Sequence, residues 1–249
     1  MTASTLRLDQ LLVERGLVET RSRARAAILA GAVRVDGTAV AKPAARVARD
    51  AALAIDPGLD THVSRAALKL IHALDCFGID PGGLVALDLG ASTGGFTEVL
   101  LERGAARVHA VDVGHGQLHP RLAGDPRVMV HEGVNARALD GTVVPEAPAL
   151  VVCDVSFIGL KLALPPALAL AAPGAWLVAL VKPQFEVGRE GLGKGGIVRD
   201  EALREEVCAD IRRWLEETAG WTVAGLVRSP ITGGDGNVEY LVAARKPMG

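Results

Sequence analysis

The chain contains 249 residues, of which 49% are hydrophobic and 22% are charged, and its formal net charge is −2. This composition supports a folded core and excludes both a disordered chain and a protein that is basic overall. The three cysteines, Cys76, Cys153 and Cys208, are far apart and odd in number, which excludes a disulfide framework and favours a reducing compartment. Arg7 and Asp9 stand where a secretion signal would have its apolar core, so we expect a cytoplasmic protein.

Charge is distributed unevenly along the chain. Residues 1–59 carry a net charge of +3, whereas the rest of the chain carries −5. This asymmetry indicates that the N-terminal part meets a polyanion, although a solvated basic helix would give the same pattern. Asp56-Pro57-Gly58 marks a linker near residues 56–63. We therefore predict two domains, 1–59 and 60–249.

The first domain has the pattern of a small α+β unit. Apolar residues at helical spacing predict two helices, one around residues 8–12 and one around 24–28. Two short apolar runs flank an Asp-Gly pair within residues 33–40, which predicts a β-hairpin, and residues 52–55 can add a strand. Arginines cluster at the start of the second helix, where guanidinium groups suit phosphate oxygens.

This unit resembles the S4 RNA-binding domain. The matching residues, in the same order, are Arg7-Leu8-Asp9, Arg21-Ser22-Arg23-Ala24, the glycine-flanked run 31–37 and Lys42-Pro43. The resemblance implies binding to structured RNA. We predict that the basic side chains at or near this domain contact RNA: Arg7, Arg21, Arg23, Arg25, Arg34, Lys42 and Arg65.

The second domain opens with a predicted helix that begins near residue 63, with Ser64 as its N-cap. Lys69 lies among apolar residues of this helix. It is either a surface lysine whose stem lies along the apolar face or a residue of a functional site.

The stretch 85–96, VALDLGASTGGF, predicts a strand, a tight glycine-rich loop and the start of a helix. Its glycines let the backbone bend and let a ligand approach closely. The spacing matches neither the dinucleotide motif nor the P-loop, so an adenosyl ligand without phosphates is favoured, and S-adenosylmethionine is the obvious one. The residues that we expect to contact this cofactor are Asp88, Gly90, Ala91, Ser92, Thr93, Gly94, Gly95 and Phe96.

Four further apolar runs predict parallel strands at residues 106–111, 127–131, 149–153 and 176–181. The residues that follow these runs include Asp112 with Val113, Asn135, Asp154 and Lys182. The carboxyl ends of parallel strands meet at one edge of a sheet, where ligands bind. We therefore expect Asp112 to bind ribose hydroxyls and Asn135 to lie near the adenine. Val113 and Asp154 are also expected to contact the cofactor. Lys182 is either a site residue or the first exposed position after its strand.

The uncharged run 162–181 is long enough to span a membrane, but prolines at 165, 166 and 173 interrupt it. We predict a short helix, a turn and a buried strand instead. Residues 188–198 form a glycine-rich basic loop, which is either a linker or a lid. A helix over 199–219 and strands at 221–228 and 238–244 complete the chain, with the last strand antiparallel and Glu239 near its start.

A metal site is not expected. His115 and His119 are four residues apart, but Gly116 and Pro120 discourage a helix between them, and no neighbouring Cys or acid completes a ligand set. His109 and His131 are expected at strand ends or at the surface.

Lys69, Asp154, Lys182 and Glu239 match the Lys-Asp-Lys-Glu tetrad of FtsJ-like RNA ribose 2′-O-methyltransferases. The closest motif matches are 90–96, Val155-Ser156-Phe157, 182–185 and 233–240. With the S4-like domain, the whole chain resembles the TlyA family, also known as hemolysin A. The resemblance implies a Rossmann-like S-adenosylmethionine-dependent domain, a mainly parallel sheet with an antiparallel last strand, preceded by the small α+β domain. It also implies methylation of cytidine ribose in 16S and 23S ribosomal RNA.

The ribose 2′-hydroxyl must attack the donor methyl group in line and lose its proton, so positioning supplies much of the rate. Lys182 is either the base or the group that orients the hydroxyl and stabilises the developing oxyanion. Burial and Lys69 would favour a neutral amine, whereas Asp154 and Glu239 would favour the ammonium. Lys69 can steer the hydroxyl or hold a phosphate.

Three other functions remain open at this stage. They are an RNA-binding assembly factor without catalysis, an S4-containing pseudouridine synthase and a membrane-active hemolysin. The tetrad argues against the first, the adenosyl-type loop against the second and the proline-broken apolar run against the third. The partners that we expect are ribosomal RNA or ribosomal subunits, with no membrane, and the protein as a monomer or weak dimer.

Overall fold

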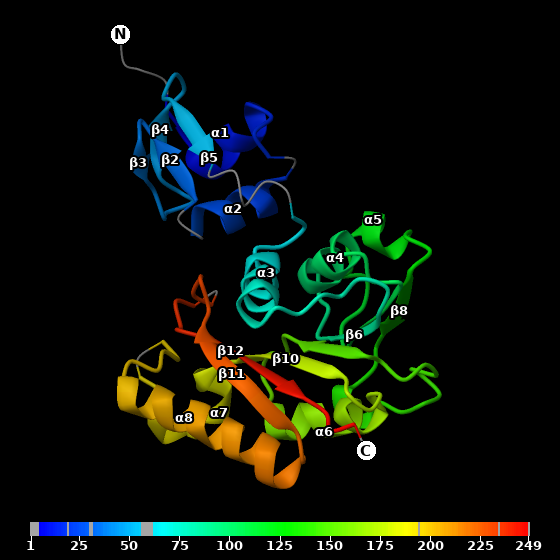
Figure 1. Cartoon of the computed structure of the whole chain (residues 1–249). Helices are drawn as coiled ribbons and strands as arrows, with labels where there is room; N and C mark the ends of the chain where they lie inside the picture. Colours follow the sequence, from blue (N-terminus) through cyan, green and yellow to red (C-terminus); the bar gives the residue numbers. More distant parts are fainter. Residues whose placement is uncertain are drawn as a thin grey trace. The chain divides into compact units, whose positions relative to one another are not determined.

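The computed structural model describes residues 5–18, 20–29, 32–55, 62–193, 195–233 and 235–248. The chain divides into two compact units, Met1–Arg65 and Ala66–Gly249 (Figure 1). The division lies six residues beyond the sequence-based boundary at 59/60. Most of the predicted linker, residues 56–61, lies outside the described residues.

The N-terminal unit packs two helices against short strands. Its elements are β1 (Thr5–Arg7), α1 (Leu8–Glu14), α2 (Arg21–Leu29), β2 (Val33–Val35), β3 (Thr38–Ala39), β4 (Arg46–Ala48) and β5 (Leu53–Ile55). The predicted hairpin is present: β2 pairs with β3 and β5, and Asp36 and Gly37 both have positive φ in its turn. The pairing of β1 with β4 was not predicted. Leu8, Leu12, Ala24 and Ile28 form the core, as the helical spacing indicated.

The larger unit contains a seven-stranded sheet in the order β11-β12-β10-β9-β6-β7-β8. The strands are β6 (Val85–Leu89), β7 (Arg107–Asp112), β8 (Val128–Glu132), β9 (Leu150–Cys153), β10 (Trp176–Val181), β11 (Thr222–Arg228) and β12 (Tyr240–Arg245). Strands β6 to β10 pair in parallel, and β12 is antiparallel to both of its neighbours. The expected antiparallel last strand is therefore confirmed. The strand order reverses between β6 and β9, which is where open α/β sheets bind ligands.

Helices cover both faces of this sheet (Figure 1). They are α3 (Ala66–Phe77), α4 (Gly95–Glu102), α5 (Pro120–Ala123), α6 (Leu160–Leu170), α7 (Pro183–Glu186) and α8 (Glu201–Arg213), with short turns at Ala136–Ala138 and Arg189–Gly191 and a π-helical turn at Trp214–Thr218. Side chains alternate between the two faces of the sheet. Leu87 and Leu89 of β6 lie on the face that packs against α6 and α8 in the main core. Asp88, between them, lies on the opposite face, where Thr97 of α4 contacts it.

The uncharged run 162–181 folds as predicted into the end of α6, a turn at residues 173–174 and β10. Pro165 and Pro166 lie inside α6. Among the described residues, no helix has both the length and the apolar character needed to cross a membrane. The α3 helix begins at Ala66, so Arg65 rather than Ser64 directly precedes it.

Candidate active site

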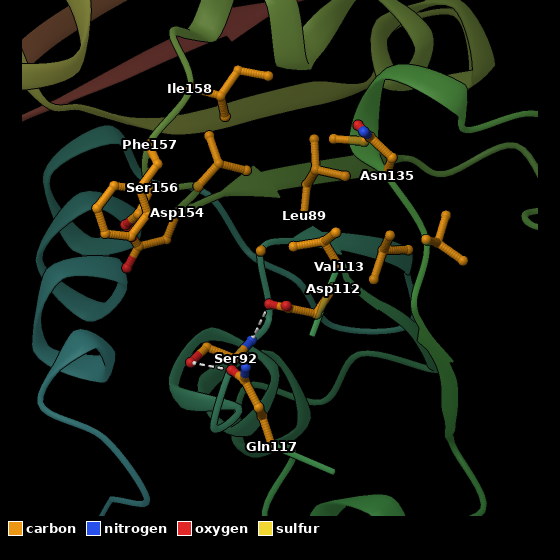
Figure 2. Close-up of a pocket in the computed structure, with 15 residues that line it drawn as sticks. Leu89, Ser92, Asp112, Val113, Gln117, Asn135, Asp154, Ser156, Phe157 and Ile158 are labelled. Atoms are coloured by element: carbon orange, nitrogen blue, oxygen red, sulfur yellow. Dashed lines mark hydrogen bonds between the residues drawn. The ribbon is translucent and has the colours of Figure 1, made fainter. Parts of the chain in front are cut away.

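A cavity of about 470 Å³ lies at the carboxyl ends of β6, β7 and β9, at the point where the strand order reverses (Figure 2). Its size lies within the usual range for small-molecule sites. Its lining consists of Leu89, Gly90, Ser92, Val111, Asp112, Val113, Gln117, Val134, Asn135, Ala136, Asp154, Val155, Ser156, Phe157 and Ile158.

Gly90 allows the glycine-rich loop to pass close to the neighbouring strand end. Its φ is +84°, and a Cβ at this position would lie 2.9 Å from the carbonyl oxygen of Asp154. Any other residue would therefore push β6 and β9 apart at the cavity. The next glycine with positive φ, Gly94, directly precedes α4 in the left-handed conformation. The expected strand–turn–helix arrangement is thus present.

Asp112 fixes the shape of the loop from the adjacent strand. Its Oδ2 accepts a hydrogen bond from the backbone N–H of Ser92 at 2.8 Å, and its Oδ1 accepts one from Gly114 at 2.7 Å. The Ser92 hydroxyl also donates to Gln117 at 3.3 Å, and Figure 2 shows these side chains together at one end of the cavity. A carboxylate has further lone pairs that can accept from ribose hydroxyls.

Some of the predicted cofactor residues line the cavity and others support it. Gly90, Ser92, Asp112, Val113, Asn135 and Asp154 belong to the lining, whereas Asp88, Ala91, Thr93, Gly94, Gly95 and Phe96 do not. Gln117 and the run 155–158 also line it and were not predicted as cofactor contacts. Gln117 stands in a loop without a recognisable motif, and only tertiary structure brings it to Ser92.

Asp88 is fully buried beneath the loop. Its Oδ2 accepts a hydrogen bond from the Thr97 hydroxyl at 2.6 Å, while its Oδ1 has no hydrogen-bond partner within the described part of the chain. Burial raises the pKa of Asp88 to about 7, and the nearby Asp154 adds to the effect. The structure therefore places Asp88 beside α4 rather than in the cavity wall.

The four residues of the predicted tetrad form two ion pairs. Lys182 Nζ lies 2.6 Å from Asp154 Oδ1, and Lys69 Nζ lies 2.6 Å from Glu239 Oε2. Val181 at the end of β10 pairs with Tyr240 at the start of β12. Lys182 comes directly after Val181, and Glu239 comes directly before Tyr240. The two ion pairs therefore lie next to each other, at the strand edge that also forms the cavity.

The surroundings of each pair restrict its movement. The Lys182 ammonium also donates to the Ser156 hydroxyl at 2.8 Å. A Cβ on Gly233 would lie 2.5 Å from Glu239 Oε1, so the loop before β12 closes tightly over this carboxylate. Buried Asn237 joins this loop to residues 196–198 through the Gly196 carbonyl and the Val198 amide. Part of the loop predicted as a lid or linker is thus held by a side chain that sequence reasoning missed.

Phe157 stands at the mouth of the cavity. Its side chain is 90% exposed, and its backbone has a φ of +65°. Its ring centroid lies 5.3 Å from that of Phe185, whose ring in turn lies 5.9 Å from Lys182 Nζ. Left-handed backbone at a residue other than glycine is strained, and such strain is concentrated at functional sites.

The N-terminal unit, Met1–Arg65, contains all seven predicted RNA contacts. Arg7 and Arg21 both bind the carboxylate of Asp9. Arg25, Arg34 and Lys42 are exposed, and Arg65 is partly buried. The side chain of Arg23 lies outside the described residues.

Two family models match the chain. The FtsJ-like methyltransferase model matches residues 62–246, and the S4 domain model matches residues 6–52. A 16S/23S rRNA (cytidine-2′-O)-methyltransferase TlyA from Mycobacterium tuberculosis is 47% identical over 244 residues, which cover 98% of this chain and 91% of that protein. The chain belongs to the TlyA family of FtsJ-like methyltransferases.

Other members of the TlyA family carry different names. Hemolysin A of Brachyspira hyodysenteriae is 39% identical and covers 95% of this chain and 98% of that protein. A solved structure from Streptococcus thermophilus is 39% identical, has a TM-score of 0.77 and covers 99% of this chain and 90% of that one. A methyltransferase structure from Bradyrhizobium japonicum with bound S-adenosyl-L-homocysteine has a TM-score of 0.52 at 18% identity, covers 77% of this chain and 92% of that chain, and shares the fold alone.

The cavity fits the family's methyl donor, S-adenosylmethionine. Gly90 lets the ends of β6 and β9 approach each other in the cavity wall, Asp112 offers oxygen atoms for ribose hydroxyls, and Val113 presents a 69% exposed apolar side chain beside them. When bound, this cofactor supplies an activated methyl group on a sulfonium. Ser92 and Gln117 supply further polar groups at this end.

Proposed function

We propose that this chain transfers a methyl group from S-adenosylmethionine to the ribose 2′-hydroxyl of cytidines in 16S and 23S ribosomal RNA. The observation that carries the proposal is the pair of adjacent ion pairs at the edge of the cofactor cavity. The relatives named for this reaction support the substrate.

The four tetrad residues can position a hydroxyl without forming a covalent bond to the substrate themselves. Lys182 pairs with Asp154 and donates a hydrogen bond to the Ser156 hydroxyl, so the position of its ammonium is restricted from two sides. We assign to Lys182 the contact with the attacking hydroxyl, whose developing negative charge the ammonium stabilises. The oxygen–methyl bond would form as the methyl–sulfur bond breaks, leaving the cofactor as a neutral thioether, and the hydroxyl proton would pass to solvent. The Lys69–Glu239 pair, which is almost fully buried, holds the adjacent wall in place. Alignment of hydroxyl and methyl group would supply most of the rate.

The cofactor contacts remain part of the proposal. We assign direct contacts to Gly90, Ser92, Asp112, Val113, Asn135 and Asp154. Asp88 and the loop residues at 91 and 93–96 would shape the loop rather than touch the ligand.

The basic N-terminal unit would supply affinity for RNA through phosphate contacts. Such binding weakens as salt rises because condensed counterions are released on association. The target nucleotide would be single-stranded or locally opened, since a 2′-hydroxyl in a helix cannot enter a narrow cavity. We further propose that the protein acts in the cytoplasm as a monomer or weak dimer and needs no metal, so that treating the protein alone with EDTA and removing the chelator before the assay leaves its activity unchanged.

The decisive experiment is transfer of a tritiated methyl group to separated 30S and 50S subunits, followed by mapping of the modified nucleotide. We expect label on the 2′-oxygen of a cytidine in one or both RNAs. Binding of subunits without transfer of label would instead identify an assembly factor. Sedimentation of the protein alone measures its oligomeric state.

A further inference from the structure

Asp9, the second residue of α1, is a fully buried acid in the small N-terminal unit. Acidic side chains are almost never fully buried unless they are paired. An acid would also repel RNA, whereas the expected RNA contacts of this unit are basic side chains. The burial of Asp9 therefore needs an explanation of its own.

Three hydrogen bonds surround the Asp9 carboxylate. Arg7 donates from Nε to Oδ1 at 3.0 Å and from Nη2 to Oδ2 at 2.9 Å, and Arg21 donates from Nη2 to Oδ2 at 3.1 Å. The hydrogen bonds from Arg7 are the largest cause that lowers the pKa of Asp9 to about 2. The group is therefore ionised at every pH at which the protein would work.

The two guanidinium groups share one oxygen atom, Oδ2, and are therefore adjacent. Side by side they would repel each other, and the carboxylate between them offsets this repulsion. Their side chains remain 41% and 57% exposed. Each guanidinium has five N–H donors, so both arginines keep donors for another ligand.

A third cation stands near the same end of α1. The backbone N–H of Asp9 donates to the Pro43 carbonyl at 3.1 Å, and that of Leu8 donates to the Ala45 carbonyl at 2.8 Å. These bonds hold the turn after Lys42 against the start of the helix, and Lys42 is exposed. The region around Asp9 is thus cationic despite the buried acid.

We propose that Asp9 is a positioning residue for RNA binding, which holds Arg7 and Arg21 side by side so that their remaining N–H groups receive one backbone phosphate. Guanidinium forks match the geometry of phosphate oxygens, and fixing them in advance reduces the entropy lost on binding. The inference rests on the proposed RNA binding of this unit.

The sign of one substitution separates this role from simple electrostatics. Asp9→Asn removes a negative charge from a protein that binds a polyanion, so charge alone would strengthen binding. Loss of positioning would weaken it. Asp50→Asn, at an exposed acid in the same unit, makes the same charge change and is the matched control.

The test is filter binding of the full-length protein to radiolabelled 23S ribosomal RNA at several salt concentrations. We expect Asp9→Asn to weaken binding about tenfold at low salt and to reduce the slope of log K against log salt by about one, which is the loss of one phosphate contact. Asp50→Asn should bind as tightly as the wild type or slightly more tightly.

Folding of the unit is checked separately. Residues 1–65 contain no Phe, Trp or Tyr, so amide hydrogen exchange in α1 reports their order and fluorescence does not. If Asp9→Asn loses the protection of its α1 amides from exchange, Arg7→Lys and Arg21→Lys are tested instead. These variants keep the positive charge but lose the planar, forked guanidinium group. Both should bind several-fold more weakly than Arg49→Lys, the matched control at an exposed arginine of the same unit that pairs with Glu14 and is not among the predicted RNA contacts.

Folded Asp9→Asn protein that binds RNA as tightly as the wild type would overturn the inference, as would Arg7→Lys and Arg21→Lys variants that bind as tightly as Arg49→Lys. If the wild type methylates subunits while these variants keep full affinity, only the positioning role fails. If the wild type neither binds nor methylates RNA, the proposed function fails together with it.

Discussion

Lys182 and Asp154 form an ion pair with 2.6 Å between Nζ and Oδ1, and they come from the ends of two adjacent parallel strands, β10 and β9. The Lys182 side chain is only 9% exposed, so its direction is set by protein contacts rather than by solvent. An ammonium held in this way can meet a reacting hydroxyl without reorganising, which is the source of most electrostatic catalysis.

Lys182→Ala should therefore abolish methyl transfer, with a loss of about a hundredfold or more, while S-adenosylmethionine binds nearly as before. Lys161→Ala is the matched control, because Lys161 pairs with Asp210 away from the cavity. Methyl transfer is measured with tritiated cofactor, and cofactor binding is measured by calorimetry. Retained activity in Lys182→Ala would contradict the assigned role.

The Lys69–Glu239 pair should behave as a buried unit. The two side chains are 7% and 3% exposed, so removing either partner leaves a buried charge uncompensated. Lys69→Met and Glu239→Gln should each lower the free energy of unfolding by about 3–5 kcal/mol. The double variant should cost less than the two single changes together. This double-mutant cycle is measured by urea unfolding, followed by tryptophan fluorescence. Strictly additive losses of unfolding free energy would show that the two residues are not coupled.

Much of this site could be predicted from the sequence because the ends of parallel strands can be recognised there and lie together in the fold. Polar residues directly after apolar runs, such as Asp112, Asp154 and Lys182, must lie at one edge of a parallel sheet. Gly90 was predictable for a related reason, since a glycine between a strand and a helix signals a close backbone approach. The tetrad residues form two ion pairs in the structure, while their catalytic roles stay a prediction.

Other features depend on tertiary contacts that no local pattern encodes. Asp88 stands one residue before the end of β6, and strand alternation turns its side chain towards Thr97 rather than into the cavity. His109 was expected at a strand end or at the surface, but it lies within β7, is buried and stacks on His131 with 5.3 Å between ring centroids. Pairing of β1 with β4 joins segments forty residues apart that are too short to show a periodicity.

The buried Asp88 should make the stability of the larger unit depend on pH. Its folded pKa of about 7 lies above the ordinary value of 3.8, so the folded protein holds the proton between these two values. The contribution of Asp88 to stability is therefore fully present below about pH 4, falls as pH rises towards 7, and is constant above that, with a total change on the order of 4 kcal/mol at most.

Asp88→Asn should remove this contribution, since an amide oxygen can still accept the Thr97 hydrogen bond and carries no charge. The difference in unfolding free energy between variant and wild type should shift in favour of the variant between pH 4.5 and pH 8. Urea unfolding is followed by fluorescence, because all three tryptophans, Trp176, Trp214 and Trp221, lie in this unit. Asp75→Asn, at an exposed acid, is the control. A difference that is the same at both pH values would contradict the assignment.

Phe157 should contribute to binding of the RNA target rather than to folding. Its ring is 90% exposed at the cavity mouth, and its positive φ is a conformation that costs about 1–3 kcal/mol for a residue other than glycine. Phe157→Gly should therefore leave the free energy of unfolding unchanged or raise it. Stacking of a base on an aromatic ring contributes about 1–3 kcal/mol, so the KM for ribosomal subunits should rise about tenfold in the same variant. Phe157→Tyr, which keeps the ring, should retain wild-type kinetics. The prediction is wrong if Phe157→Gly loses stability or keeps the wild-type KM, since either result would make the exposed ring a structural element.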